Sequence, residues 1–138
     1  MLSIKWNNEK MNLGISLIDE QHKKLVELIN KIVVSIENNT QVENVEKLIE
    51  ELIEYTKYHF STEEKLFIEH NLEIKDIEKH KNEHKNFIDK SMGIYSNIKE
   101  DNSFKNNQGI EVLTDLYDYL TRWLVNHILI EDRKIFNK

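Results

Sequence analysis

Five of the six histidines fall at positions where a helix would place buried apolar residues. They are His22, His59, His80, His84 and His127. The sixth, His70, lies in a polar connection and is expected to be exposed and outside any site. Glu63 follows His59 by one helical turn, so both side chains share a helix face. Burying an ionised carboxylate without a partner costs several kcal/mol, and a cation offsets that cost. Singly, His22 or His127 fits a hydrogen-bonded core residue, His80 with His84 a coincidence on the surface, and His59 with Glu63 a hydrogen-bonded pair. Together they favour a buried metal ion.

The composition restricts both the metal and the partners. The chain has no cysteine, which excludes disulfides and thiolate metal sites, and the remaining nitrogen and oxygen ligands suit iron, zinc or manganese. The net charge of -6 and the lack of a basic face argue against nucleic acid as a partner. The N-terminus lacks the apolar core of a secretory signal, and no apolar run is long enough to span a membrane. We therefore expect a cytoplasmic protein.

Helices must position these residues. Proline is absent and glycine occurs only three times, while long segments repeat apolar residues in steps of three and four. We predict an all-α fold, namely an up-down-up-down antiparallel four-helix bundle with an irregular N-terminal arm over about residues 1–16. The predicted helices span about residues 17–38, 42–67, 76–99 and 110–131, within a single domain over residues 1–138.

Some single residues carry structural predictions. Ser16 and Asp19 resemble a capping box at the start of the first helix. Gly93 lies inside the third helix, where we expect it to mark close packing at a cost of about 1 kcal/mol relative to alanine. Thr56 and Ser91 fall on inward faces, and we expect their hydroxyls to bond to helix carbonyls.

The candidate residues fall within four motifs, DEQH at 19–22, HFSTEE at 59–64, HKNEH at 80–84 and WLVNHILIED at 123–132. In their order and spacing these motifs resemble those of the hemerythrin family, specifically its single-domain bacterial members. The resemblance covers essentially the whole chain. It implies a four-helix bundle around a non-haem di-iron centre that binds O2 reversibly.

The resemblance also implies a set of metal ligands. One iron would be bound by His80, His84 and His127, the other by His22 and His59, and both would be bridged by Glu63 and Asp132. The implied cofactors are two iron ions per chain, joined by an oxo or hydroxo bridge. If both irons are six-coordinate, this set leaves one vacant position. The vacancy belongs to the iron with two histidines, and O2 would bind there.

The position of Asp132 does not follow from regular helix geometry. Five residues beyond His127 correspond to about 500° of rotation, which leaves the two side chains about 140° apart on an α-helix. A widened turn, or the end of the helix, would have to redirect Asp132. On spacing alone Asp132 would be a surface acid.

The function implied by the resemblance is reversible O2 binding for oxygen transport, storage or delivery, and we expect no enzymatic activity. An apolar O2 pocket is expected beside the two-histidine iron, lined by Leu25, Phe60, Trp123 and Leu124. An oxygen or redox sensor, or a scavenger of peroxide or nitric oxide, would use the same site. An oxygen-activating ferritin-like enzyme is disfavoured because the sequence lacks Glu-x-x-His repeats. A di-zinc hydrolase is also disfavoured, because it would need an accessible cleft and the candidate ligands are buried on the inward faces of four helices. The sequence does not indicate a protein partner.

Overall fold

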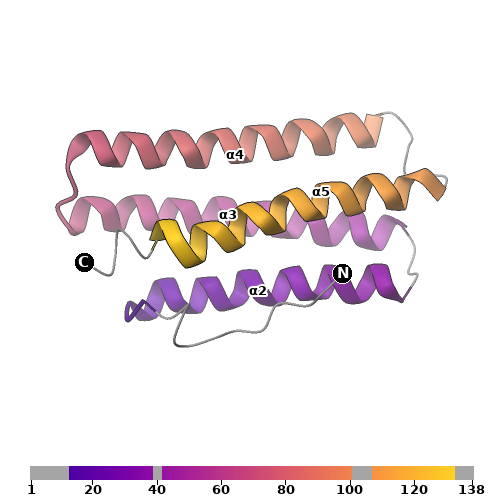
Figure 1. Cartoon of the computed structure of the whole chain (residues 1–138), viewed down its shortest axis with the longest axis horizontal. Coiled ribbons are helices and arrows are strands. Elements are labelled where there is room, and N and C mark those ends of the chain that lie inside the picture. Colours follow the sequence, from indigo (N-terminus) through magenta and orange to yellow (C-terminus); the bar gives the residue numbers. More distant parts are fainter. Residues whose placement is uncertain (1–12, 39–41, 101–106, 133–138) are drawn as a thin grey trace.

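The computed structural model describes residues 13–38, 42–100 and 107–132, which form four α-helices and a short π-helix. The helices are α2 (Ser16–Glu37), α3 (Val42–Glu69), α4 (Ile74–Glu100) and α5 (Asn107–Asn126), and the π-helix η2 (His127–Glu131) continues α5. Consecutive helices run in opposite directions, and α2 and α4 each pack against both α3 and α5 (Figure 1). The prediction of an all-α, antiparallel four-helix bundle is confirmed.

The observed helices overlap with the predicted ranges over most of their length. Residues 1–12 of the predicted arm lie outside the described residues. That residues 1–138 form one domain stays a prediction. Among the described helices, none is both long and apolar enough to cross a membrane.

The core is formed by the inward faces predicted from the sequence. In α2, Ile18, Leu25 and Ile29 have no exposed surface, and they follow the helical spacing. The two inward hydroxyls behave as predicted: those of Thr56 and Ser91 each donate to the carbonyl four residues earlier, at 2.7 Å. These bonds allow polar side chains to be buried between the helices.

Two local predictions were wrong. No capping box forms, because the N-cap of α2 is Ile15 and no side chain caps the helix. Asp19 instead accepts hydrogen bonds from the backbone N–H groups of Leu13 (2.7 Å) and Gly14 (3.0 Å). Gly93 marks no close packing, because it is exposed and a Cβ atom at this position would meet nothing within 4 Å.

The connection between α3 and α4 reverses the chain, so that the later part of α3 faces the earlier part of α4. Asn71 has a positive φ of 57°, and its N–H bonds to the carbonyl of Ile68 at 3.1 Å. The N–H of Leu72 bonds to the carbonyl of Phe67, also at 3.1 Å. These two bonds form a Schellman motif, which ends α3. His70, in this connection, is exposed as predicted.

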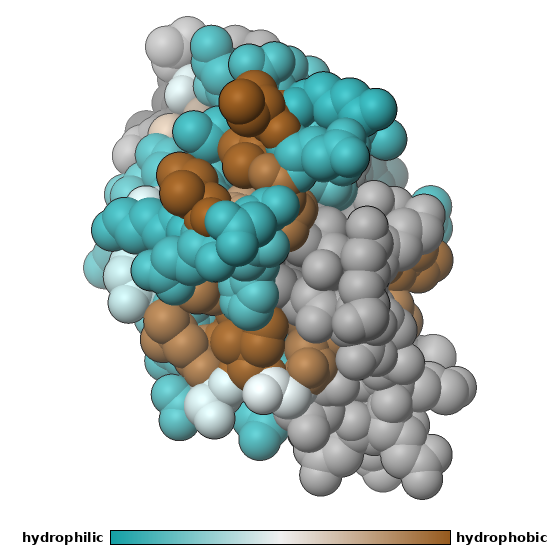
Figure 2. Space-filling view, turned by 90° about the vertical axis from the view of Figure 1, so that its left-hand side faces the viewer, coloured by the Kyte–Doolittle hydropathy of each residue, from teal (hydrophilic) through white to brown (hydrophobic). Residues whose placement is uncertain are grey.

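The end of the bundle at this connection exposes apolar side chains among polar ones, as Figure 2 shows. Ile68 and Ile74, on either side of the connection, are 61% and 76% exposed. Single exposed apolar residues are common on protein surfaces. The buried residues behind this end of the bundle are more unusual, because several of them are polar.

Candidate metal centre

Glu63 lies at the centre of a buried polar cluster. It is fully buried, and its carboxylate faces the Nε2 atoms of four histidines. Its Oε1 lies 2.6 Å from Nε2 of His59 and 3.6 Å from Nε2 of His22. Its Oε2 lies 3.3 Å from Nε2 of His84 and 3.0 Å from Nε2 of His127. One carboxylate therefore contacts imidazoles from α2, α3, α4 and η2.

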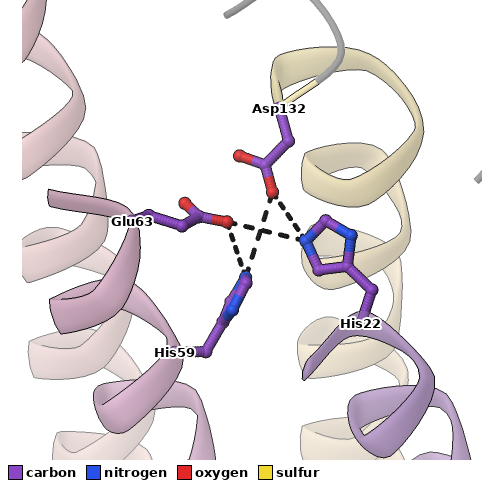
Figure 3. A group of neighbouring side chains, drawn as sticks. All are labelled: His22, His59, Glu63 and Asp132. Atoms are coloured by element: carbon purple, nitrogen blue, oxygen red, sulfur yellow. Dashed lines mark hydrogen bonds and ion pairs between the residues drawn. The ribbon is translucent and has the colours of Figure 1, made fainter. Parts of the chain in front are cut away.

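A π-helix brings Asp132 into the same cluster. The backbone N–H of Asp132 bonds to the carbonyl of His127, five residues earlier, whereas an α-helix uses four. Of the two explanations expected for Asp132, a widened turn or the end of the helix, the structure has the widened turn. Oδ2 of Asp132 lies 2.8 Å from Nε2 of His22 and 3.9 Å from Nε2 of His59 (Figure 3). Its Oδ1 lies 3.0 Å from Nε2 of His127.

The two carboxylates divide the cluster into two sides. Oε1 of Glu63 and Oδ2 of Asp132 face the histidines of α2 and α3, whereas Oε2 and Oδ1 face histidines of α4 and η2. Oε1 also lies 3.1 Å from Nε2 of His127, which is therefore near both oxygens of Glu63. The potential ligand atoms that lie within 4.8 Å of one another form two groups: His22, His59, Glu63 and Asp132, and Glu63, His84 and His127. A carboxylate that directs one oxygen to each of two ligand sets is suited to bridging two metal ions.

Burial and charge act against each other in this cluster. Burial by itself would raise the pKa of Glu63, but the charges of His127 and His59 hold it well below its usual range. Burial opposes protonation of His127, yet the charges of Asp132 and Glu63 raise its pKa well above the usual value. For His59 burial dominates, so its pKa is lowered despite the neighbouring Glu63. Burial therefore favours the neutral form of His59, whose ring faces the carboxylate of Glu63.

This arrangement fits a cation better than hydrogen bonds alone. Nε2 of His59 and Nε2 of His84 are buried and have no hydrogen-bond partner. Nδ1 of His59 lies 2.8 Å from Oε1 of Gln21, an oxygen that can only accept, so a neutral ring carries its hydrogen on Nδ1 and leaves Nε2 unprotonated. At 2.6 Å from a carboxylate oxygen, that Nε2 brings two lone pairs together, which repel unless a positive charge lies between them. A metal ion would satisfy both atoms, because neutral imidazole nitrogen and carboxylate oxygen are its usual ligands. The residues present thus fit a metal centre.

Comparisons with known proteins agree with this geometry. The family model described as the hemerythrin HHE cation binding domain matches residues 13–138. The chain belongs to the hemerythrin family. It is 33% identical to a bacteriohemerythrin of Clostridium acetobutylicum, covering 94% of this chain and 95% of that protein. A bacteriohemerythrin of Stenotrophomonas maltophilia is 31% identical over 96% of this chain and 79% of its own length. A hemerythrin-like protein of Naegleria gruberi is 30% identical over 88% and 82%.

One histidine of the hemerythrin motif HKNEH, His80, lies outside both groups of ligand atoms. Its Nδ1 is 3.6 Å from Oε2 of Glu83, and its ring centroid is 5.5 Å from that of Phe67. His80 is one helical turn before His84 on the same face of α4, so it lies beside the site without joining it. Its role as a ligand stays a prediction.

Two of the residues expected in a hemerythrin-type O2 pocket contact the histidines of α4 and η2. The ring of Phe60 stacks on that of His84, with centroids 3.9 Å apart and planes 2° apart, and its centroid is 6.0 Å from that of His59. Trp123 stacks on His127, with centroids 5.1 Å apart. The part of both residues in an O2 pocket stays a prediction. Phe60 points toward α4 because it follows His59 by one residue, and neighbouring side chains on a helix are about 100° apart.

Two polar residues next to the ligands were not assigned a role from the sequence. Gln21 is 3% exposed, and its Oε1 lies 2.8 Å from Nδ1 of His59. Oε1 of Glu64 lies 3.8 Å from Nδ1 of His84. Gln21 could have been found from its spacing, because it falls three residues after Ile18 on the apolar face of α2. Glu64 gives no such signal, because its position depends on how α3 and α4 pack.

Proposed function

We propose that the protein binds O2 reversibly at a pair of iron ions, for oxygen transport, storage or delivery. Membership of the hemerythrin family and the similarity to proteins named bacteriohemerythrin support this proposal. The ligands would be His22 and His59 for one ion, His80, His84 and His127 for the other, and Glu63 and Asp132 between them. His80 would have to turn from Glu83 toward the site, one turn along α4 from His84.

The observation that carries the proposal is the way each carboxylate divides its two oxygens between histidines of different helices. Asp132 divides its oxygens in this way within a fully buried cluster, and Glu63 directs Oε1 to His59 and Oε2 to His84, with His127 near both oxygens. Metal pairs in proteins lie about 3.5–4 Å apart, a separation that a carboxylate can bridge. Two ferrous ions would supply the two electrons and the vacant coordination position that reversible O2 binding requires. The chain would contribute neutral imidazoles, two compensating negative charges and a fixed geometry.

The surroundings of the cluster favour reversible binding over oxygen activation. Leu25 and Leu124, the other two expected pocket residues, are completely buried and would exclude water. Activation of oxygen usually needs a proton donor, and a buried acid beside the site would provide one. Among the described residues, the buried acid outside the cluster is Asp19, and both of its oxygens already accept backbone hydrogen bonds. It is not available as a proton donor.

The test is an optical titration of the purified, iron-quantified protein. Spectra would be recorded fully reduced without air, after addition of O2, and after removal of the O2. We expect two irons per chain, a visible absorption band that appears with O2, and its loss on deoxygenation. A chain that binds no iron would overturn the proposal, as would O2 that cannot be removed again.

A second outcome would identify the alternative use of the same site. If two irons bind but O2 oxidises them irreversibly, the metal centre is supported and the O2-carrier function is refuted. Addition of peroxide or nitric oxide to the reduced protein would then separate a scavenger, which consumes these molecules repeatedly, from a sensor, which reacts once. The iron content therefore tests whether the metal site exists, and the reversibility of the spectral change tests whether the site carries O2.

A further inference from the structure

A chain of hydrogen bonds leads from a backbone carbonyl to the outer nitrogen of His59. The hydroxyl of Thr62 donates to the carbonyl of Tyr58 at 3.2 Å. Nε2 of Gln21 donates to the hydroxyl oxygen of Thr62 at 3.1 Å. Oε1 of Gln21 then lies 2.8 Å from Nδ1 of His59, in a buried contact between α2 and α3. The chain thus connects the backbone of α3 to a side chain that faces the metal centre.

The carbonyl of Tyr58 at the start of this series fixes the donor and the acceptor of each hydrogen bond in it. A carbonyl oxygen can only accept, so Thr62 uses its single hydrogen on Tyr58 and must accept from Gln21. Gln21 therefore turns its amide nitrogen to Thr62 and its oxygen to His59. That oxygen can also only accept, so Nδ1 of His59 carries the ring hydrogen. The lone pair of Nε2 is left facing Glu63.

The outer nitrogen on the other side of the site has a charged neighbour instead. Nδ1 of His84 lies 3.8 Å from a carboxylate oxygen of the half-buried Glu64. A carboxylate beside the outer N–H makes an imidazole a stronger donor to a metal than a neutral amide does. Nδ1 of His84 makes no hydrogen bond, so Glu64 acts on it through its charge. The two outer nitrogens therefore differ in the charge of their neighbours, a hydrogen-bonded amide at His59 and a carboxylate at His84.

We infer that Gln21 is a positioning residue, which together with Thr62 holds His59 as its Nδ1–H tautomer with a neutral outer partner. The inference rests on the proposed function, because His59 would be a ligand of the two-histidine iron. A ligand with a neutral partner donates less electron density, which stabilises the ferric state less. Gln21 therefore helps to keep this iron ferrous, the state that binds O2.

The geometric part of the inference can be tested with two threonines of α3. Thr62 and Thr56 both donate to a carbonyl four residues earlier, and Thr62 also accepts from Gln21. We expect Gln21→Leu to lower the affinity for zinc, a redox-inert probe, by about 10- to 100-fold, with Thr62→Val acting in the same direction. Thr56→Val should leave zinc affinity unchanged, and Thr62→Ser should restore it.

The measurements are chelator competition for zinc and nitrogen-15 NMR of the histidine rings in the zinc-loaded protein. In the wild-type protein Nδ1 of His59 should carry a proton, and in Gln21→Leu and Thr62→Val its signal should shift. Zinc affinity and a His59 ring signal that stay at wild-type values in both variants would overturn the inference. The Thr62→Ser variant separates loss of the hydroxyl from a general disturbance of the helix.

The electrostatic part is tested by Gln21→Glu, which keeps the shape of the side chain and adds a negative charge. The matched control is Ser61→Asp, because Ser61 is exposed and only two residues from His59. We expect the midpoint potential of the iron-loaded protein, measured by spectroelectrochemistry, to fall in Gln21→Glu and to change much less in Ser61→Asp. Equal shifts in the two variants, or no shift in Gln21→Glu, would refute the electrostatic role.

The zinc experiment separates this inference from the proposed function. It requires neither iron nor O2, so loss of zinc affinity in Gln21→Leu supports the positioning role even if the iron protein fails to bind O2 reversibly. Conversely, the wild-type protein could bind O2 reversibly while the Gln21 variants keep their zinc affinity and midpoint potential. That result would support the proposed function and refute the role of Gln21.

Discussion

The two halves of the bundle are stabilised in different ways. The half nearest the α3–α4 connection buries histidines and carboxylates, whereas the half where α2 ends and α3 begins buries mainly apolar side chains such as Ile32, Ile49 and Leu116. Burial of apolar surface stabilises a fold by about 25 cal/mol per Å2 without any partner. Buried charges stabilise it only when they are compensated. We therefore expect the apolar half to be stable without a bound cation, and the polar half to need one for its stability.

The largest effect is expected from Glu63→Gln, because the carboxylate of Glu63 contacts histidines on both sides of the site. The substitution removes the charge that we propose to bridge the two metal ions, and it directs an amide N–H at histidine nitrogens. We expect both metal ions to be lost, as measured by metal analysis after desalting. Helix content by circular dichroism should largely persist, because the apolar half is untouched.

The neighbouring Glu64→Gln provides the control for that substitution. Glu64 is half-buried and lies 3.8 Å from Nδ1 of His84, outside both groups of ligand atoms. It should retain two metal ions per chain. A Glu63→Gln protein that still holds either ion would show that Glu63 is not a shared ligand.

Removal of the metal should weaken one half of the bundle more than the other. A ligand present at about a thousand times its Kd stabilises the folded state by about 4 kcal/mol, and chelation removes this term. We expect amide hydrogen exchange to accelerate most around His22 and His59 and least around Ile32 and Ile49. The same acceleration along all four helices would contradict a division of the bundle into two halves.

The converse experiment weakens the apolar half. Ile49 has no exposed surface, and truncation of such a residue to alanine costs about 2–5 kcal/mol. We expect Ile49→Ala to lower the free energy of unfolding by this amount, measured in urea on the metal-free protein, without changing the metal content of the loaded protein. Ile74→Ala, at a position 76% exposed, should change the stability little. Loss of metal from Ile49→Ala would show that the two halves are coupled.

A smaller difference is expected between two histidines of α4. His84 is 3% exposed with Nε2 at 3.3 Å from Glu63, whereas His80 must first leave Glu83 and Phe67. We therefore expect His84→Ala to weaken the second metal ion about tenfold more than His80→Ala does, a difference of about 1.4 kcal/mol. Metal titrations of both variants measure it. Equal losses would mean that His80 is as firmly placed as His84 once metal is bound.

The sequence predicted the helices and most buried positions, because three- and four-residue spacing depends only on helix geometry. Spacing alone placed Asp132 on the surface, and only the family resemblance implied that a widened turn, or the end of the helix, redirects it inward; the structure has the widened turn. The position of Phe60 against His84 could not be predicted in this way, and for Gln21 the spacing indicates burial but not the contact with His59. Both depend on contacts between helices, and spacing within one helix does not specify which neighbouring helix a side chain meets.

Gly93 shows the same limit and gives the smallest predicted effect. A glycine inside a helix suggests close packing from the sequence, but Gly93 is exposed and a Cβ atom there meets nothing within 4 Å. Gly93→Ala should therefore raise the free energy of unfolding by about 0.5–1 kcal/mol, because alanine restricts the unfolded chain and favours the helix. Metal content should not change.

Gly14→Ala should instead lower the free energy of unfolding in the same urea titration. Gly14 has a φ of +82°, a conformation that alanine adopts only with strain. If both substitutions lowered stability, the space beside Gly93 would have to be filled in solution by a neighbour, and the helix would be packed there after all.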